Sequence, residues 1–150
     1  PYLHILDECM QLKRSMRAKR QLLFVINYGD LNEFGHGLDV PKEYQDLADI
    51  LVFGLDKDCD EALINEVQQF VRAENKFALV TLGKYGSVAW DGGTSYIQSA
   101  HDVTVQDTTG AGDSFLAGFL ITFLKTHNIQ QSLQQGTTLA SRAIQKMGAY

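Results

Sequence analysis

A short glycine-rich segment is the part of the sequence best suited to catalysis. It runs Asp107-Thr108-Thr109-Gly110-Ala111-Gly112-Asp113 and directly precedes a long apolar helical pattern. Glycines let the backbone approach a ligand, and the unpaired N–H groups of a first helical turn point toward it with the positive end of the helix dipole behind them. The segment therefore predicts an anion-binding turn suited to a phosphoryl group in transfer.

Asp113 is the predicted proton acceptor beside this turn. It falls in the first turn of the expected helix, where the dipole favours a carboxylate and an incoming hydroxyl can reach it. Phosphoryl transfer needs mainly positioning and electrostatic stabilisation, which backbone donors supply. A purely structural interpretation is equally open from these residues alone: Asp113 complements the dipole, Asp107 and the threonines cap the turn, and the glycines permit close packing.

Two competing motifs fit this segment poorly. The dinucleotide pattern G-x-G-x-x-G needs a small residue where Phe115 stands, and Asp113 would repel a pyrophosphate bound there. The nucleophile pattern G-x-S-x-G fails because Leu116 occupies its final glycine position. A dinucleotide-dependent oxidoreductase is thus disfavoured, whereas a nucleotide-binding or regulatory protein without turnover remains an alternative.

A second glycine-bearing loop runs Thr81-Leu82-Gly83-Lys84-Tyr85-Gly86 and leaves an expected buried strand. In an open parallel sheet the ligand crevice lies beyond the carboxyl ends of the strands, where this loop is expected. Taken alone, it would be interpreted as an ordinary turn into the next strand. Both loops at strand exits in one chain favour a nucleotide site.

Composition limits the class of protein. The chain has 150 residues, 45% hydrophobic content and a net charge of −5, which suits one compact acidic unit. Basic residues are scattered except in the first expected helix, where we interpret them as a solvated face, so nucleic acid is a poor candidate partner. Cys9 and Cys59 lack CxxC spacing, the histidines lack ligand spacing, and no apolar run of about 20 residues occurs. We expect a reduced cytoplasmic protein with no membrane partner and no directly bound metal.

Alternating apolar patterns predict an α/β fold. We expect helices at 3–16, after Pro41, at about 58–75, at 111–127 and at 129–147; strands at 22–26, 50–53, 77–82, 87–90, 94–97 and 103–105; and a loop at 27–37. Helices between strands imply right-handed crossovers and a largely parallel sheet covered on both faces. The turn Asp91-Gly92-Gly93 predicts a hairpin and hence an antiparallel edge.

The segments DTTGAGDSFLAGF and VTLGKYGSVAW resemble the carboxy-terminal signature and the nucleotide loop of ribokinase-like (PfkB-type) carbohydrate kinases, in the same order and separation. The resemblance extends over residues 22–150. It implies a ribokinase-like three-layer αβα sandwich with a mostly parallel sheet. Residues 1–150 would form the carboxy-terminal nucleotide-binding and catalytic part of a single domain, here lacking the amino-terminal half and lid.

The resemblance also implies roles for individual residues. These are an anion hole at Gly110, Ala111 and Gly112, a base at Asp113, ATP-binding residues at Thr81, Gly83, Lys84 and Gly86, and a monovalent-cation (K⁺) loop near Asp107 and Thr109. The family's N-x-x-E pattern is replaced by Gly54-Leu55-Asp56-Lys57, so we assign no protein ligand to metal and expect Mg²⁺ to arrive with ATP. Asp58 and Asp60 are expected to cap a helix instead.

The resemblance further implies an ATP-dependent sugar kinase that phosphorylates a hydroxyl. The segments VTLGKYGSVAWDG, QQGTTLAS and AIQKMGAY are most similar to kinases of glycated amino acids. They imply a sugar or a glycated amino acid such as fructoselysine as the substrate, and a homodimer is a further expectation. Because the first residue is Pro1, we expect the chain to be a fragment that is inactive alone.

Overall fold

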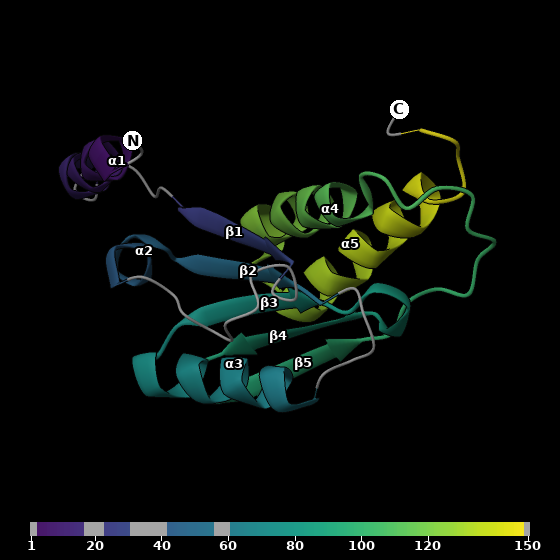
Figure 1. The fold of residues 1–150 in the computed structure, drawn as a ribbon, viewed down its shortest axis with the longest axis horizontal. Coiled ribbons are helices and arrows are strands. Elements are labelled where there is room, and N and C mark those ends of the chain that lie inside the picture. Colours follow the sequence, from purple (N-terminus) through teal and green to yellow (C-terminus); the bar gives the residue numbers. More distant parts are fainter. Residues whose placement is uncertain (1–2, 17–22, 31–41, 56–60, 149–150) are drawn as a thin grey trace.

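The computed structural model describes residues 3–16, 23–30, 42–55 and 61–148 (Figure 1). Its helices and strands follow the predicted alternation. In chain order they are α1 (Leu3–Met16), β1 (Val25–Asp30), α2 (Lys42–Leu47), β2 (Ile50–Gly54), α3 (Glu61–Glu74), β3 (Phe77–Thr81), the 3₁₀ turn η1 (Gly83–Tyr85), β4 (Ser87–Asp91), β5 (Thr94–Gln98), α4 (Ala111–Thr126) and α5 (Ile129–Ala143).

The strands form one sheet in the order β1-β2-β3-β4-β5. The first three strands pair in parallel, as strands joined by helices must, whereas β3, β4 and β5 pair antiparallel. The predicted hairpin edge is confirmed. The sheet of the described residues is therefore mixed, with a parallel part joined to a hairpin.

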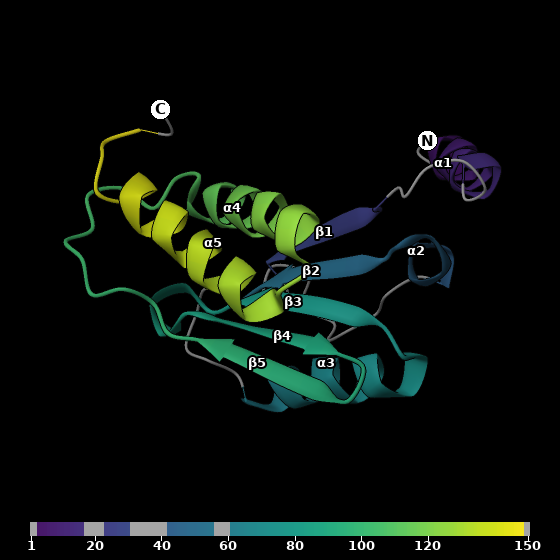
Figure 2. The same cartoon turned by 180° about the vertical axis from the view of Figure 1, so that it is seen from behind.

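Helices cover both faces of this sheet and make three layers (Figures 1 and 2). Four consecutive residues of β2, 50–53, are fully buried because neighbouring side chains point to opposite, equally covered faces. Leu51 and Phe53 pack in the cluster that holds α3, whereas Ile50 and Val52 pack in the cluster that holds α4 and α5.

The α4 and α5 helices cross with their backbones in contact. A Cβ atom at Gly136 would lie 2.8 Å from the carbonyl oxygen of Phe115, and one at Gly118 would lie 3.0 Å from that of Gln135. Real Cβ atoms have no space at the first of these distances without a backbone shift. The pair of glycines therefore fixes the separation of the two helices.

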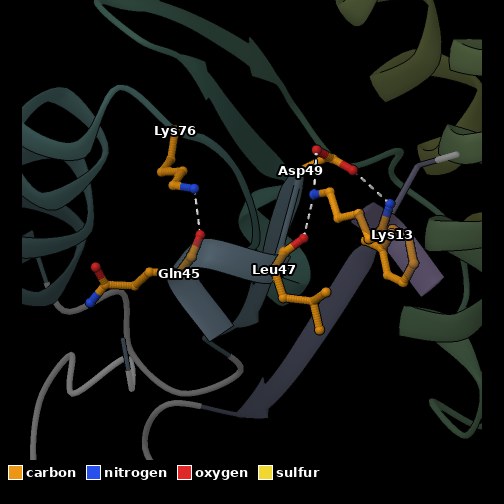
Figure 3. A network of polar contacts seen from close by, with 6 residues as sticks. Lys13, Gln45, Leu47, Asp49 and Lys76 are labelled. Carbon is orange, nitrogen blue, oxygen red and sulfur yellow. Dashed lines mark hydrogen bonds and ion pairs between the residues drawn. The ribbon is translucent and has the colours of Figure 1, made fainter. Parts of the chain in front are cut away.

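A network of hydrogen bonds around Asp49 joins helix α1 to the segment between α2 and β2 (Figure 3). The ammonium group of Lys13 donates to the carboxylate of Asp49 over 2.8 Å and also to the carbonyl oxygen of Leu47. The other oxygen of Asp49 accepts from the backbone N–H of Phe24 over 2.9 Å. The interpretation of the basic helix as a solvated face is wrong for Lys13, whose side chain is 12% exposed. Arg17, Lys19 and Arg20 lie outside the described residues.

The first strand departs from its predicted position. It begins at Val25 and continues to Asp30, so residues 27–30, predicted as loop, are strand. Asn27 pairs with Val52 and Asp30 with Gly54, with an irregular register between them. Polar residues are tolerated here because β1 is at the edge of the described sheet and has one uncovered flank.

Two further predictions were wrong for one shared reason. Residues 103–105 form no strand, and α5 ends at Ala143 instead of Met147. The N–H groups of Gln106 and Asp107 both donate to the carbonyl oxygen of Ile144, over 2.8 and 3.3 Å. The connection after β5 thus pairs with the end of α5 instead of the sheet, and it occupies the carbonyl that a longer helix would use.

Candidate active site

One end of the sheet gathers the residues predicted to bind a nucleotide. The strand register aligns Gly54, Thr81, Ser87 and Gln98 in a single row across four strands. The carboxyl ends of β2, β3 and β5 therefore lie together. This is the end at which open α/β sheets bind ligands.

The start of α4 lies at the same end. The ring of Phe77, the first residue of β3, contacts the rings of Phe119 and Phe123 in the second half of α4, with centroids 6.0 and 5.6 Å apart. Helix α4 thus runs opposite to β3, and its amino terminus points toward the carboxyl end of that strand. Figure 2 shows the turn after β3, the end of β5 and the start of α4 at one end of the molecule.

The turn that opens α4 has the geometry of an accessible anion site. Gly110 takes a left-handed conformation with φ of 77°, and no side chain caps the helix. The N–H of Ala111 donates to the carbonyl oxygen of Thr108 over 3.1 Å, so this donor is used within the turn. Gly112 and Asp113 are exposed, and a Cβ atom at Gly112 would meet nothing within 4 Å. The helix start at Gly112 is therefore open to an approaching ligand.

Asp107 joins this turn to the end of the chain. Its Oδ1 atom accepts from the N–H of Thr109 over 2.8 Å, and its Oδ2 atom accepts from the N–H of Gly148 over 3.0 Å. Hydrogen bonds from the backbone and side chain of Thr109 and from the backbone of Gly148 hold the pKa of Asp107 below its ordinary value. A carboxylate can accept about four hydrogen bonds, so these three leave one lone pair for the predicted cation contact.

The loop between β3 and β4 is held by its own backbone. Gly86 has a φ of 104°, and a Cβ atom there would lie 2.1 Å from the carbonyl oxygen of Gln98. Its conformation is therefore required by contact with the end of β5. Gly83 and Lys84 are exposed, and the ammonium group of Lys84 lies 5.1 Å from the ring centroid of Tyr85.

Two buried hydroxyl groups were missed by sequence reasoning. Ser87 is 1% exposed and Thr137 on α5 is 5% exposed, yet neither hydroxyl has a hydrogen-bond partner within the described part of the chain. By contrast, the hydroxyls of Ser132 and Ser141 donate to backbone carbonyls on α5. An unsatisfied buried hydroxyl is costly, so Ser87 and Thr137 are candidates to contact a ligand or water. A serine directly after the Gly86 turn was the available signal.

Metal ligands are not gathered in the described residues. These residues contain no group of three or more His, Cys, Asp or Glu side chains that could hold an ion. Asp56, Asp58 and Asp60 lie outside the described residues.

Across the helices that the structure describes, none has the length and apolar character needed to cross a membrane.

A hollow of about 280 Å³ lies elsewhere, between α4 and α5. Its lining includes Gly118, Ile121, Lys125 and Leu139. None of its lining residues belongs to either glycine-bearing loop. We therefore place the candidate site by the loops and the strand ends.

Comparison with known proteins identifies the family and the fold. The model of the pfkB family of carbohydrate kinases matches residues 46–150. Fructoselysine 6-kinase of Shigella flexneri is 44% identical over 91 residues, which cover 61% of this chain and 35% of that protein. Arabidopsis thaliana ribokinase, solved with ribose and ATP, superposes with a TM-score of 0.76 at 25% identity and covers 99% of this chain and 48% of its own.

A fructokinase of Vibrio cholerae, solved with fructose, ADP and calcium, has a TM-score of 0.58 at 28% identity, covering 69% of this chain and 37% of its own. The fold is therefore ribokinase-like, as predicted. The chain spans between a third and a half of the length of these three relatives.

Proposed function

Because the chain belongs to the pfkB family of carbohydrate kinases, we propose that it is the carboxy-terminal nucleotide-binding and catalytic part of an ATP-dependent sugar kinase. The observation that supports this most directly is the open start of α4. Its first turn has no side-chain cap, Gly112 faces empty space, and Asp113 is exposed beside it. This turn lies at the same end of the sheet as the loop between β3 and β4.

In the proposed reaction, the acceptor hydroxyl of the sugar attacks the γ-phosphorus of ATP. A new bond forms between that oxygen and phosphorus, the bond to ADP breaks, and Asp113 takes the proton of the hydroxyl. The carboxylate is a weak base toward an alcohol, so the proton moves as the new bond forms. Backbone N–H groups at Gly110 and Gly112 stabilise the charge on the transferring group.

Cofactors follow from the same proposal. Mg²⁺ arrives with ATP and, when bound, neutralises charge on the phosphates. We assign ATP contacts to Thr81, Gly83, Lys84 and Gly86, and a K⁺ contact to Asp107 and Thr109. The geometry of Gly86 supports an indirect role, because this residue shapes the loop through its contact with the end of β5.

The proposed substrate is a glycated amino acid such as fructoselysine. Its support is the 44% identity to a fructoselysine 6-kinase within 91 residues. A cytoplasmic location and a homodimer stay predictions. An ATP-consumption screen of the complete enzyme against fructoselysine, ribose, fructose phosphates and nucleosides tests the substrate, and silence toward fructoselysine beside turnover of another sugar would replace it.

Substitution of Asp113 by Asn tests the catalytic role. In the complete enzyme we expect turnover to fall by a factor of about 10² to 10⁴, because a general base contributes that much. ATP affinity, measured by calorimetry, should remain within a few-fold because the amides stay in place. Asp91→Asn is the matched control, since this exposed carboxylate pairs in register with Phe77 at the opposite end of β3. A non-catalytic nucleotide-binding protein, our alternative, would bind ATP and show no sugar-dependent turnover with or without the substitution.

A further inference from the structure

After the end of α5, the backbone forms hydrogen bonds with the segment around Asp107 instead of continuing the helix. In a continuing helix the N–H of Gly148 would donate to the carbonyl oxygen of Ile144, four residues earlier. Here that carbonyl accepts from Gln106 and Asp107, and the N–H of Gly148 donates to the carboxylate of Asp107. Both halves of the missing helical bond are thus satisfied by Gln106 and Asp107, and the bond from Gly148 to Asp107 spans 41 positions of the chain.

Asp107 also contacts the other side of this junction. While its Oδ2 atom accepts from Gly148, its Oδ1 atom accepts from Thr109 in the turn that opens α4. One carboxylate therefore bridges the anion-binding turn and the segment after α5. An ionised carboxylate suits this position because both its oxygens accept and its bonds to N–H groups are charge-assisted.

The turn 108–112 needs such an anchor because, within the described residues, its other hydrogen bonds are local. The N–H of Ala111 donates to Thr108, and that of Ser114 donates to Gly110, which define the shape of the turn and not its position. Thr108, Thr109 and Gly112 are exposed and contribute little packing. Helices α4 and α5, by contrast, are locked together at Gly118 and Gly136. The bond from Gly148 therefore ties the turn to the segment that directly follows this locked pair of helices.

We propose that Asp107 is a positioning residue that holds the anion-binding turn 108–112 in register with the segment after α5, independently of any bound cation. This inference rests on the proposed function for its catalytic consequence. Asp107 does not touch the reacting atoms in this role. It acts through the backbone of Thr109 and keeps the donors of the following residues aimed at the phosphoryl group.

The test compares Asp107→Asn with the control Asp102→Asn, an exposed carboxylate in the same connection. Asparagine keeps one acceptor oxygen but places an NH₂ group at the other position, so one of the two bonds must be lost. Amide hydrogen exchange of this chain, in buffer free of K⁺, should rise about tenfold in 106–113 and 144–148, the expected cost of one charge-assisted bond. Exchange in β2 and β3 should not change, and the control should match the original chain.

Three results would overturn the proposal. Unchanged exchange in both segments would show that Asp107 holds nothing, and a difference seen only when K⁺ is added would show that it acts as a cation ligand. A rise spread over the whole chain would show a general folding role. If Asp107→Asn does not fold, Asp107→Glu replaces it in the test, because glutamate retains both carboxylate oxygens. This variant should fold, with exchange rates in the two segments between those of the original chain and those of the unfolded chain. Failure of both variants to fold would also show a general folding role.

Turnover of the complete enzyme gives the second measurement. Asp107→Asn should lower kcat about tenfold or more through misplaced donors, with KM for the sugar nearly unchanged. Saturating K⁺ should not restore kcat. The exchange experiment requires no activity, so absence of turnover in the original enzyme would reject the proposed function while leaving the positioning inference separately testable.

Discussion

At the turn between β3 and β4, Gly86 has no room for a side chain, whereas at the start of α4, Gly112 faces open space. The two glycines lie at the same end of the sheet and in the two loops predicted to bind ATP. In the first loop the chain's own backbone at Gln98 requires glycine. In the second loop, Gly110 is required by its left-handed φ of 77°, but nothing in the described residues requires glycine at position 112.

This difference separates two reasons for a glycine at a binding site. Gly86 is needed for the fold of the loop, and its effect on a ligand is indirect. For Gly112, our proposal supplies the reason: a phosphate at the helix start must approach the backbone closely. Substitutions at the two positions should therefore affect different measurements.

The largest expected effect is that of Gly86→Ala on stability. The added methyl would overlap the backbone of Gln98 and Ala100, and a φ of 104° is strained for alanine. We expect the free energy of unfolding to fall by at least about 2 kcal/mol, measured by urea denaturation. Gly93→Ala is the control, because its added Cβ would meet nothing. Equal stability of the two variants would show that the fold of the loop does not require glycine at position 86.

Gly112→Ala should leave stability intact and damage function. Alanine is favoured over glycine in a helix, and the space around this Cβ is empty, so unfolding should shift by less than about 1 kcal/mol. In the complete enzyme kcat/KM for ATP should fall roughly 10-fold to 100-fold, because the methyl displaces the phosphate from its donors. Normal kinetics would mean that the open space serves no ligand.

A smaller effect on stability and ATP affinity is expected for substitution of Ser87. This substitution tests whether a side chain directly after the first loop contacts the nucleotide. Ser87→Ala removes a buried hydroxyl without a partner, so the free energy of unfolding should stay level or rise by up to about 1 kcal/mol. ATP affinity should fall a few-fold if that hydroxyl meets the ligand. Ser132→Ala is the comparison, because its hydroxyl donates to Asn128 and its loss should destabilise without altering ATP binding.

The sequence was sufficient to predict the elements that depend on local patterns. Helix α1 and the starts of α4 and α5 lie at the predicted residues, and the hairpin follows its turn. The errors arise where contacts with residues far away in the sequence determine the local structure. Residues 103–105 have strand propensity but lie beside a connection bonded to α5, and Lys13 has a partner in Asp49, 36 residues away.

The same limit applies to the candidate site. The glycine pattern predicted an anion-binding turn at the start of α4, because helix starts expose N–H groups wherever they occur. The bond from Gly148 to Asp107 and the burial of Thr137 follow from how α5 packs, which no local pattern records. Those features were absent from the sequence-based description for that reason.

Among the described residues, β1 pairs with β2 alone, which leaves one flank of its backbone without a sheet neighbour. Such a flank is a template for strands of other molecules, because its backbone N–H and C=O groups lack sheet partners. Production of this polypeptide alone thus invites sheet-to-sheet growth and precipitation. An Asn27→Lys substitution at this exposed position is a rational solubilising choice, because residue 27 lies within β1 and outside both glycine-bearing loops.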